Sequence, residues 1–298
     1  MICVGVDAGG TATVAQASFG GAPAREAHGG AANATVIGVD DAADVIVTTI
    51  RAATGGRAPD TVYAGVAGAG RARVASGVRE LIEAAFRGAA VVVGDDATIA
   101  LRAAVPSGDG AVLVAGTGSF AYAECGERTA RVGGLGYLAG DEGSAYAIGM
   151  DAVKLYGRVL DGRARRDETS DLVARALDAP DRDALIAALY DAPMQPARIA
   201  ALAPPIVAFA GKGNRASTKI VQQAAQELGE LVKAALRGAG LLDGSPSIAF
   251  AGGLLRENSV LSYLLETRLQ GDVPGAAIVK HGDPPVAGAL RLAQRLVR

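Results

Sequence analysis

The sequence predicts an α/β protein made of two halves with related designs. Strand-like and helical patterns alternate along most of the 298-residue chain, which is typical of layered α/β structure. A strand, a glycine-rich turn and a second strand also occur twice, at residues 2–17 and 111–123. Hydrophobic residues make up 50% of the chain, so it can bury enough apolar surface for two domains.

The first of these hairpin patterns begins the chain. Its first strand ends at Asp7, its turn contains Gly9, Gly10 and Thr11, and its second strand runs to Ala17. Glycine lets a backbone approach an anion closely, and successive N–H groups form a concave cradle for phosphate. We therefore expect this turn to bind nucleotide phosphates, the alternative being an ordinary glycine-rich hairpin.

The rest of the first half alternates between helices and strands. The expected elements are a helix at 40–54, a strand at 61–66, a helix at 74–86, a strand at 91–95 and a helix at 97–104. Ligands of open α/β sheets bind at the carboxyl ends of the strands. Asp7, Gly68 and Asp96 all follow or end a strand, so we expect them at one ligand site.

Residues 106–110 are expected to connect the halves, and the second half opens with the turn Gly116, Thr117, Gly118 and Ser119. A glycine-rich loop at 133–144 follows. Beyond it, the patterns predict helices at 145–159, 167–177, 182–190, 198–210 and 217–238, a strand at 247–251, a helix at 257–269, a strand at 277–280 and a helix at 285–297. Two phosphate-type hairpins about a hundred residues apart suggest a duplicated domain that holds a nucleotide.

Composition argues against several functions. The net charge of -2 and the absence of a basic stripe give no reason to expect nucleic acid. The longest apolar run, 199–210, is too short to span a bilayer, and no basic leader opens the sequence, so we expect a cytoplasmic protein without a membrane partner. With two histidines and two distant cysteines, a catalytic triad or a histidine-ligated zinc site is not expected.

The carboxylates are the candidates for chemistry. Phosphoryl transfer needs a phosphate cradle, a divalent ion, a carboxylate beside the accepting hydroxyl, and closure against water. Asp7 is placed to hold Mg²⁺ on a nucleotide, or it only forms the turn. Either Asp95 or Asp96 could cap the following helix or accept a proton. Asp141, in a loop between glycines, could meet a ligand directly.

Together these motifs resemble the N-acetylglucosamine kinase group of the BadF/BadG/BcrA/BcrD ATPase family, within the sugar kinase, Hsp70 and actin ATPase superfamily. The resemblance covers nearly the whole chain. Its motifs are Asp-Ala-Gly-Gly-Thr at 7–11, Asn33, Ala-Gly at 67–68, Asp-Ala at 96–97, Gly-Thr-Gly-Ser at 116–119, Gly-Gly-Leu-Gly at 133–136, Gly-Asp-Glu-Gly-Ser at 140–144, Ala-Gly-Gly at 251–253 and residues 284–290.

The resemblance implies a fold of two ribonuclease H-like (actin-like ATPase) domains that flank a nucleotide cleft. The first domain would span residues 1–106 and the second residues 107–284, the latter with a helical insert. A C-terminal helix at 285–298 would return to the N-terminal domain.

The same resemblance implies an ATP- and Mg²⁺-dependent amino-sugar kinase that phosphorylates the 6-hydroxyl of N-acetylglucosamine or glucosamine. Asp96 would be the general base, because the family pattern has one aspartate followed by alanine. The residues implied for nucleotide are Asp7, which would also bind the metal, Gly9, Gly10, Thr11, Gly116, Thr117, Gly118, Gly252 and Gly253. Those implied for sugar are Asn33, Gly68, Asp96, Ser119, Gly134 and Asp141. The sequence leaves open whether the protein is a homodimer.

Three positions depart from the family pattern and bear on the substrate. Leu135 stands where relatives often carry Trp, Phe120 replaces a polar sugar contact, and Asn214 replaces an aspartate. The alternative function is an ATPase that activates a partner enzyme. Such activators hold an iron–sulfur cluster with cysteines, and Cys3 and Cys125 do not suit that role. A third hypothesis for the function is a sugar-sensing regulator without enzymatic activity.

Overall fold

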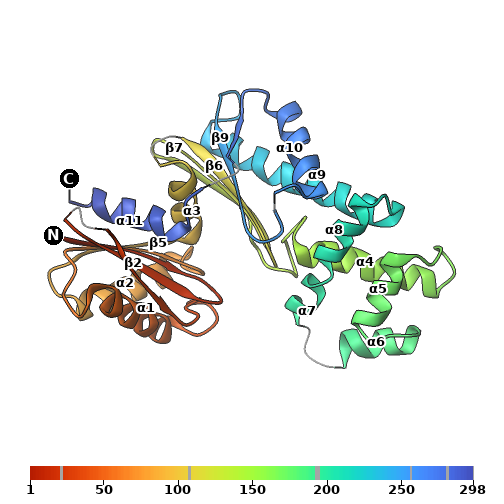
Figure 1. The fold of residues 1–298 in the computed structure, drawn as a ribbon, viewed down its shortest axis with the longest axis horizontal. Helices are drawn as coiled ribbons and strands as arrows, with labels where there is room; N and C mark the ends of the chain where they lie inside the picture. Colours follow the sequence, from red (N-terminus) through yellow and green to blue (C-terminus); the bar gives the residue numbers. More distant parts are fainter. Residues whose placement is uncertain (21–22, 107–108, 192–194, 256, 280–281, 298) are drawn as a thin grey trace. The chain divides into compact units, whose positions relative to one another are not determined.

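Each half of the chain builds a five-stranded mixed sheet around one glycine-turn hairpin (Figure 1). The computed structural model describes residues 1–20, 23–106, 109–191, 195–255, 257–279 and 282–297. The chain divides into unit 1, Met1–Gly108 with His281–Arg298, and unit 2, Asp109–Lys280. The predicted α/β class is therefore confirmed. Lys280, predicted as strand, and part of the predicted connection at 106–110 lie outside the described residues.

The sheet of unit 1 has the strand order β3-β2-β1-β4-β5. Its strands are β1 (Ile2–Ala8), β2 (Thr13–Phe19), β3 (Arg25–Gly29), β4 (Thr61–Val66) and β5 (Ala90–Asp95). β1, β4 and β5 run parallel, with Asp7 opposite Gly65 and Val66 opposite Asp95. The carboxyl ends of these three strands therefore meet at one edge of the sheet.

In the described part of unit 1, four helices cover this sheet. They are α1 (Val39–Thr54), α2 (Ala72–Ala85), α3 (Asp96–Ala104) and α11 (Pro285–Arg295). In Figure 1, α1 and α2 lie on one face, and α3 and α11 lie on the other. Because both faces are covered, the apolar side chains of β1 and β4 are buried, among them Val4, Val6 and Val62 at 0% exposure.

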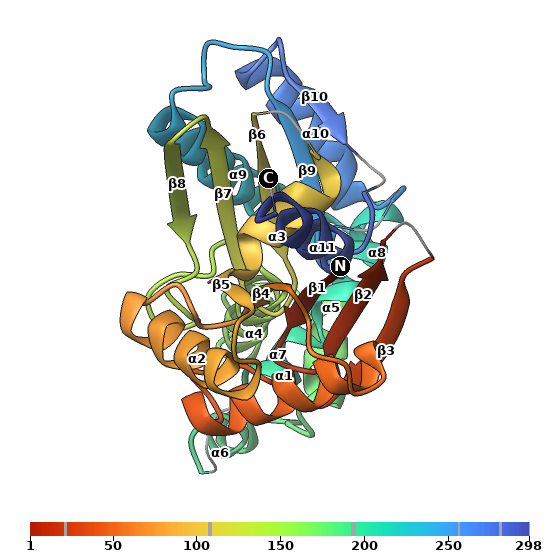
Figure 2. The ribbon, with the colours of Figure 1, turned by 90° about the vertical axis from the view of Figure 1, so that its left-hand side faces the viewer.

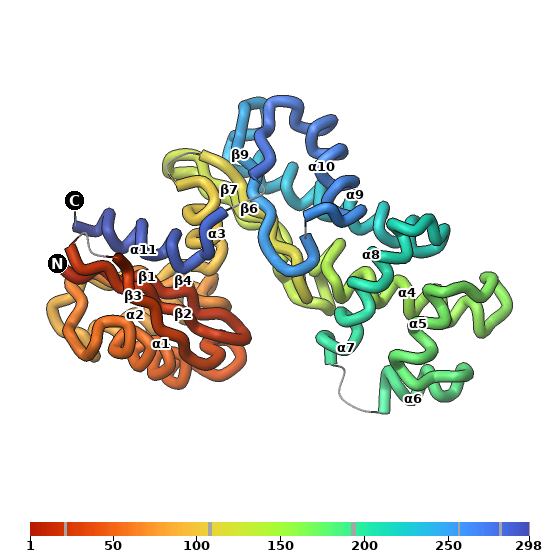
Figure 3. Tube along the Cα trace, viewed as in Figure 1, coloured from red at the N-terminus to blue at the C-terminus, as the bar shows by residue number. Residues whose placement is uncertain are grey.

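Helix α11 packs closely against β1 and α3, although it comes from the other end of the chain (Figure 3). A Cβ added to Gly5 would lie 2.1 Å from the backbone nitrogen of Leu290, and one added to Gly288 would lie 2.1 Å from the carbonyl oxygen of Ile99. Arg291 also donates hydrogen bonds of 3.2 Å to the carbonyl oxygens of Arg102 and Ala103. Gly5 is therefore needed where β1 contacts α11, and Gly288 is needed where α11 contacts α3.

The sheet of unit 2 repeats the order of unit 1, with β8-β7-β6-β9-β10 in place of β3-β2-β1-β4-β5 (Figure 2). Its strands are β6 (Gly110–Ala115), β7 (Ser119–Cys125), β8 (Arg128–Gly133), β9 (Ser247–Ala251) and β10 (Ala277–Val279). In both sheets the first strand forms an antiparallel hairpin with the second and a parallel pair with the fourth. The repeated topology agrees with a duplicated domain.

Most helices of unit 2 come between β8 and β9. They are α4 (Ala145–Leu160), α5 (Glu168–Ala176), α6 (Arg182–Tyr190), α7 (Pro196–Ala200), α8 (Ala203–Gly211) and α9 (Arg215–Ala239), and α10 (Val260–Asp272) follows β9. Helix α9 packs on β6, β7 and β8, and α8 and α10 pack against α9. In the described part of the chain, no helix has the length and apolar character needed to cross a bilayer.

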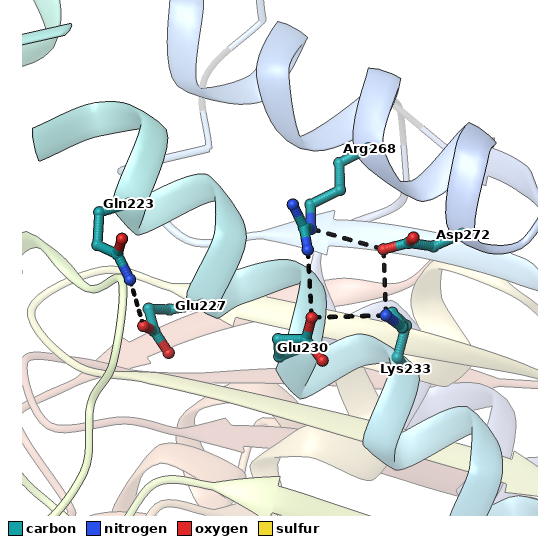
Figure 4. A network of polar contacts seen from close by, with 6 residues as sticks. All are labelled: Gln223, Glu227, Glu230, Lys233, Arg268 and Asp272. Atoms are coloured by element: carbon teal, nitrogen blue, oxygen red, sulfur yellow. Dashed lines mark hydrogen bonds and ion pairs between the residues drawn. The ribbon is translucent and has the colours of Figure 1, made fainter. Parts of the chain in front are cut away.

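An ion network joins α9 to α10 (Figure 4). Arg268 lies 3.2 Å from Glu230 and 3.5 Å from Asp272, while Lys233 lies 3.5 Å from Glu230 and 3.3 Å from Asp272. The four side chains keep part of their surface in water, so each pair contributes at most about 1 kcal/mol to stability. Most of the attachment of α10 therefore comes from its buried leucines, Leu261, Leu265 and Leu269.

Candidate active site

The turn after β1 presents backbone donors at the edge of the sheet of unit 1. The N–H of Gly9 closes the turn by donating to the carbonyl of Ala12 at 2.9 Å. Gly10 and Thr11 are exposed, and within the described residues their backbone N–H groups donate to no protein acceptor. Two adjacent donors at an exposed turn can bind a phosphate oxygen.

The carboxylate of Asp7 ends the same strand and is partly buried. Burial raises the pKa of Asp7 above its ordinary value. The structure shows no hydrogen bond or ion pair to this side chain from any residue it describes. A desolvated carboxylate without a protein counter-charge suits a cation, and Mg²⁺ on a nucleotide needs only one or two carboxylates because it keeps water and phosphate oxygens. No group of three or more metal-ligand side chains occurs among the described residues.

Asn33 and Gly68 lie together beside this turn. The Oδ1 atom of Asn33 accepts a 3.0 Å hydrogen bond from the N–H of Thr35, and the hydroxyl of Thr35 donates to the carbonyl of Gly68 at 3.4 Å. Gly68 has φ +86°, and a Cβ there would lie 2.8 Å from Asn33 Oδ1. A Cβ added to Gly10 would lie 4.0 Å from Asn33 Nδ2. The amide of Asn33 is thus fixed between two glycine turns.

Asp95 and Asp96 occupy the carboxyl end of β5 and the start of α3. Asp95 is the N-cap residue, because its Oδ1 accepts a 2.8 Å hydrogen bond from the N–H of Ala97. Asp96 is the first residue of the helix, where the helix dipole favours a negative charge. The two adjacent carboxylates therefore occupy different positions in the backbone, one at the N-cap and one in the first turn of α3.

The register of the sheet places these carboxylates relative to Asp7. Asp7 belongs to β1 and Asp95 to β5, with β4 between them. Two strand spacings correspond to about 10 Å. That separation leaves room for a ligand group along the edge of the sheet. Asp7 and the carboxylates at the end of β5 can therefore contact different atoms of a ligand.

The turn between β6 and β7 repeats the exposed donors in unit 2. The first amides of α4 hold this turn from behind: Ala145 donates to the carbonyl of Gly116 at 2.9 Å, and Tyr146 donates to that of Thr117 at 3.2 Å. The N–H groups of Thr117 and Gly118 have no acceptor among the described residues. The structure thus fixes the carbonyls of the turn and leaves two of its N–H groups for a ligand.

Asp141 lies directly behind this turn. Its Oδ1 accepts a 3.2 Å hydrogen bond from the N–H of Ser119, and the hydroxyl of Ser119 donates to the carbonyl of Glu142 at 2.7 Å. Burial raises the pKa of Asp141, the hydrogen bond from Ser119 lowers it, and the charge of Glu142 raises it, with burial the largest effect. Asp141 also has φ 60°, a left-handed conformation that is uncommon outside glycine.

Two glycines leave space around Asp141 and Ser119. A Cβ on Gly118 would lie 2.8 Å from both carboxylate oxygens of Asp141. The N–H of Gly134 donates to the carbonyl of Ser119 at 2.9 Å. Ser119, Gly134 and Asp141 therefore form one cluster.

The turn after β9 lies against the end of β6. Gly252 has φ +93°, and a Cβ there would lie 2.3 Å from the carbonyl oxygen of Ala115. The N–H of Leu254 donates to the same carbonyl at 3.1 Å. A Cβ on Gly253 would meet nothing within 4 Å. Gly252 and Gly253 thus lie beside the glycine turn that starts at Gly116.

The three residues that depart from the family pattern, Leu135, Phe120 and Asn214, have different surroundings. Leu135 is 74% exposed and Leu138 is 86% exposed, so the loop after Gly134 presents apolar side chains to solvent. The ring of Phe120 lies under the guanidinium of Arg131, 3.9 Å from its carbon to the ring centroid. Asn214 caps α9 by accepting a 2.9 Å hydrogen bond from the N–H of Ser217. Asn214 is thus explained as a helix cap.

Sequence reasoning missed some residues that shape these clusters. Thr35 and Arg131 lie beside predicted residues through the contacts described above. The Asn-Ala-Thr pattern at 33–35 is a turn signal that could have indicated the role of Thr35. No local signal indicates that Arg131 stacks on Phe120, because the pairing depends on the register of β7 and β8.

Comparisons with known proteins agree on one group of enzymes. A model of the BadF/BadG/BcrA/BcrD ATPase family matches residues 4–291. The N-acetylmuramic acid/N-acetylglucosamine kinase of Clostridium acetobutylicum is 27% identical over 231 residues, which are 77% of this chain and 76% of that protein. The N-acetyl-D-glucosamine kinase of Dictyostelium discoideum is 27% identical over 187 residues, 62% of this chain and 59% of that protein.

Solved structures match over the whole chain. A candidate N-acetylglucosamine kinase from Chromobacterium violaceum is 27% identical, with a TM-score of 0.76 over 98% of this chain and 99% of that one. A ROK family glucokinase from Streptomyces griseus, solved with glucose and AMPPNP, has a TM-score of 0.57 over 99% of both chains. At 17% identity, this second match shows a shared fold only.

Proposed function

The chain belongs to the BadF/BadG/BcrA/BcrD ATPase family, and from that premise we propose that it is an ATP-dependent amino-sugar kinase. The reaction is transfer of the γ-phosphoryl group to the 6-hydroxyl of N-acetylglucosamine or glucosamine. Relatives named N-acetylglucosamine kinases, which match most of the chain, support this substrate class.

One observation carries the proposal. Each unit has a glycine turn with two backbone donors that bond to no acceptor in the described part of the chain, and each turn lies beside a polar cluster of the kind that binds sugar hydroxyls. In unit 1 the cluster is Asn33 with Gly68, and in unit 2 it is Ser119 and Gly134 with Asp141. Phosphoryl transfer needs both kinds of group, because catalysis depends on positioning and charge stabilisation.

The nucleotide would be bound by the glycine turns. Gly9, Gly10 and Thr11 supply donors from unit 1, and Gly116, Thr117 and Gly118 supply donors from unit 2. Gly252 and Gly253 have no side chains, which would let the adenine approach the backbone. The carboxylate of Asp7 would hold Mg²⁺, whose contribution is to neutralise charge on the phosphates.

Asp96 would act as the general base. Its carboxylate would take the proton of the sugar 6-hydroxyl while the sugar oxygen bonds to the γ-phosphorus, and the bond from that phosphorus to the leaving ADP oxygen would break. Asp95 caps α3, and Asp96 is assigned this role because the family pattern has one aspartate followed by alanine, as at 96–97. Asn33 and Asp141 would hydrogen-bond other sugar hydroxyls and so orient the reacting one.

The proposal is tested by measuring ADP release with N-acetylglucosamine, glucosamine, N-acetylmuramic acid, glucose and no sugar. Release that depends on an amino sugar, with a 6-phosphate product identified by phosphorus NMR, would support the kinase. Equal release without sugar would instead favour an ATPase that activates a partner protein.

A further inference from the structure

A basic cavity lies in unit 2 between α4, the segment after it and the first turns of α9. Its volume is about 660 Å³, and it is lined by the cationic residues Lys154, Arg158, Arg165, Arg215 and Lys219. Cavities of roughly 300–1,000 Å³ are the usual size for small-molecule sites. The cavity is therefore large enough for a small ligand, and its walls favour an anion.

Among the residues that the structure describes, most of these positive charges have no protein partner. Lys154 pairs with Asp151 at 2.9 Å, and Asp167 uses its carboxylate to cap α5 by accepting from the N–H of Ser170 at 3.0 Å. The side chains of the other lining cations, Arg158, Arg165, Arg215 and Lys219, make no ion pair or hydrogen bond within the described residues. The cavity thus has a positive charge that the surrounding protein does not neutralise.

The positions of two of these cations are unfavourable for the helix that carries them. Arg215 is the first residue of α9 and Lys219 is one turn further along, so both lie near the positive end of the helix dipole. Like charges four residues apart also repel, by roughly 0.2–0.5 kcal/mol. The first turn of α9 has no acidic residue to offset them. A bound anion would relieve both effects.

Half-buried apolar side chains also line the cavity. Leu155 and Ile220 line it from α4 and α9, with Ala164 and Ala216 beside them. Exposed cations beside half-buried apolar side chains suit a ligand that has a phosphate group and an organic part. We infer that this cavity binds a small phosphorylated compound, whose phosphate contacts the arginines and Lys219.

This cavity is separate from the candidate active site. None of the residues assigned above to nucleotide or sugar lines it. A smaller cavity of about 200 Å³ shares Asp151 and Gln223 with it and reaches Glu142 and Gly143, which follow Asp141 in the chain. Both cavities are therefore lined by residues of α4 and α9. The inference about the larger one does not depend on the kinase assignment.

The test is isothermal titration of the nucleotide-free protein without Mg²⁺. The probes are glucose 6-phosphate, inorganic pyrophosphate and, as the uncharged control, glucose. The variant is the double substitution Arg158→Gln and Arg215→Gln. The matched control is Arg237→Gln, an exposed arginine on the same helix, about 33 Å from Arg215 at 1.5 Å per residue.

We expect saturable binding of a phosphate probe that weakens as NaCl is raised, because salt screens exposed charges. The double variant should raise Kd at least tenfold, since a hydrogen bond to a charged group contributes about 1.5–3 kcal/mol. The control variant should bind like the wild type. Tighter binding of glucose 6-phosphate than pyrophosphate would support a ligand with an organic part, and the reverse order would contradict that part of the inference.

The melting temperature of the double variant without ligand should equal or exceed that of the wild type, because the substitution removes an unfavourable charge from the start of α9. Loss of binding could then not come from unfolding. An unchanged Kd in the double variant, or no saturable binding of either phosphate probe to the wild type, would overturn the inference.

Discussion

Asp95 and Asp96 are neighbours in the chain, yet the backbone gives them different surroundings. The side chain of Asp95 accepts from the N–H of Ala97 and so caps α3, while Asp96 is the first helical residue. This difference arises at the junction of β5 and α3, where the chain turns from strand to helix. It allows the two carboxylates to be tested separately.

Asp96→Asn should lower turnover by about 10² to 10⁴ with little change in nucleotide affinity, because a general base contributes a factor of that size. Asp95→Asn is the matched control. Asparagine is as good an N-cap as aspartate, so this variant should keep its fold and most of its activity. Steady-state kinetics and nucleotide titration would check both variants. Normal turnover in Asp96→Asn would exclude Asp96 as the base.

Asp7→Asn should stabilise the ligand-free protein at neutral pH. Burial raises the pKa of Asp7, so the folded state holds the proton to higher pH than the unfolded state does. The wild type therefore bears the cost of a buried charge above the raised pKa and loses that cost as the pH falls through it. The melting temperatures of the two proteins should differ at pH 7 and converge in acid.

The same two proteins should respond differently to nucleotide. MgATP should raise the melting temperature of the wild type more than that of Asp7→Asn, because the variant lacks the carboxylate proposed to hold the metal. Lower stability of ligand-free Asp7→Asn at pH 7 would contradict the account of this side chain.

Gly118→Ala should weaken sugar binding. The new Cβ would lie 2.8 Å from the carboxylate oxygens of Asp141 and would displace them. Loss of one hydrogen bond to a charged group should raise the KM for sugar roughly 10- to 100-fold. Gly116→Ala, whose Cβ meets no protein atom within 4 Å, should leave that KM unchanged. If both variants kept the wild-type KM for sugar, Asp141 would have no contact with it.

Residue patterns predicted the candidate groups but not all of their neighbours. Gly-Thr-Gly-Ser and Gly-Asp-Glu-Gly-Ser mark turns from local composition, so Ser119 and Asp141 could be named from the sequence. That Gly118 must lack a Cβ because Asp141 lies behind it depends on two segments meeting in space. The same holds for Arg131 on Phe120.

Among the elements, apolar strands and long helices were predicted well, and two of the edge strands were missed. β4 and β9 have the predicted bounds, because their apolar runs end abruptly at glycine-rich turns. β3 and β8 were missed. They are edge strands in which charged residues are frequent, so their sequences lack the apolar alternation of a half-buried strand.

The predicted helix at 198–210 is instead the pair α7 and α8, separated at residues 201–202. Pro204 and Pro205 cause this break. Proline has no N–H to donate, and its ring clashes with the carbonyl four residues earlier. The prolines therefore begin α8 and cannot continue α7.

Substitution of Gly288 by Ala should destabilise unit 1. The added Cβ would lie 2.1 Å from the carbonyl oxygen of Ile99 and 2.6 Å from the backbone nitrogen of Ala103, which must move apart. Overpacking of this kind costs about 1–3 kcal/mol. Gly157→Ala in α4 is the control, because its Cβ meets nothing within 4 Å and alanine should stabilise the helix by about 0.5–1 kcal/mol. Urea unfolding would measure both, and equal effects would contradict the packing argument.

At the scale of the whole molecule, the two units differ in how the chain builds them. Unit 2 is one continuous segment with its own core, whereas unit 1 needs both the first residues and α11. The paired hairpins indicated a duplicated domain, but the strand order of the two sheets depends on pairings that were not predicted, among them those of β3 and β8. The helices between β8 and β9 could be predicted one by one, but their packing on one another depends on long-range contacts that periodicity does not report.

A fragment of residues 109–280 should therefore fold when expressed alone, with a cooperative thermal transition followed by circular dichroism. A fragment of residues 1–108 should not, because the face of β1 that α11 covers would be exposed. Adding a peptide of residues 281–298 to the shorter fragment should restore structure. Cooperative unfolding of 1–108 without that peptide would show that α11 is dispensable.

The attachment of α11 to β1 also sets an order of events on the ribosome. β1 ends at Ala8 and α11 begins at Pro285, so the two partners are synthesised tens of seconds apart at about 5–20 residues per second. Throughout that interval the emerging N-terminal sheet exposes an apolar face, while the later segment can already complete its own core. Chaperones should therefore bind the N-terminal sheet of the nascent chain until α11 has left the exit tunnel.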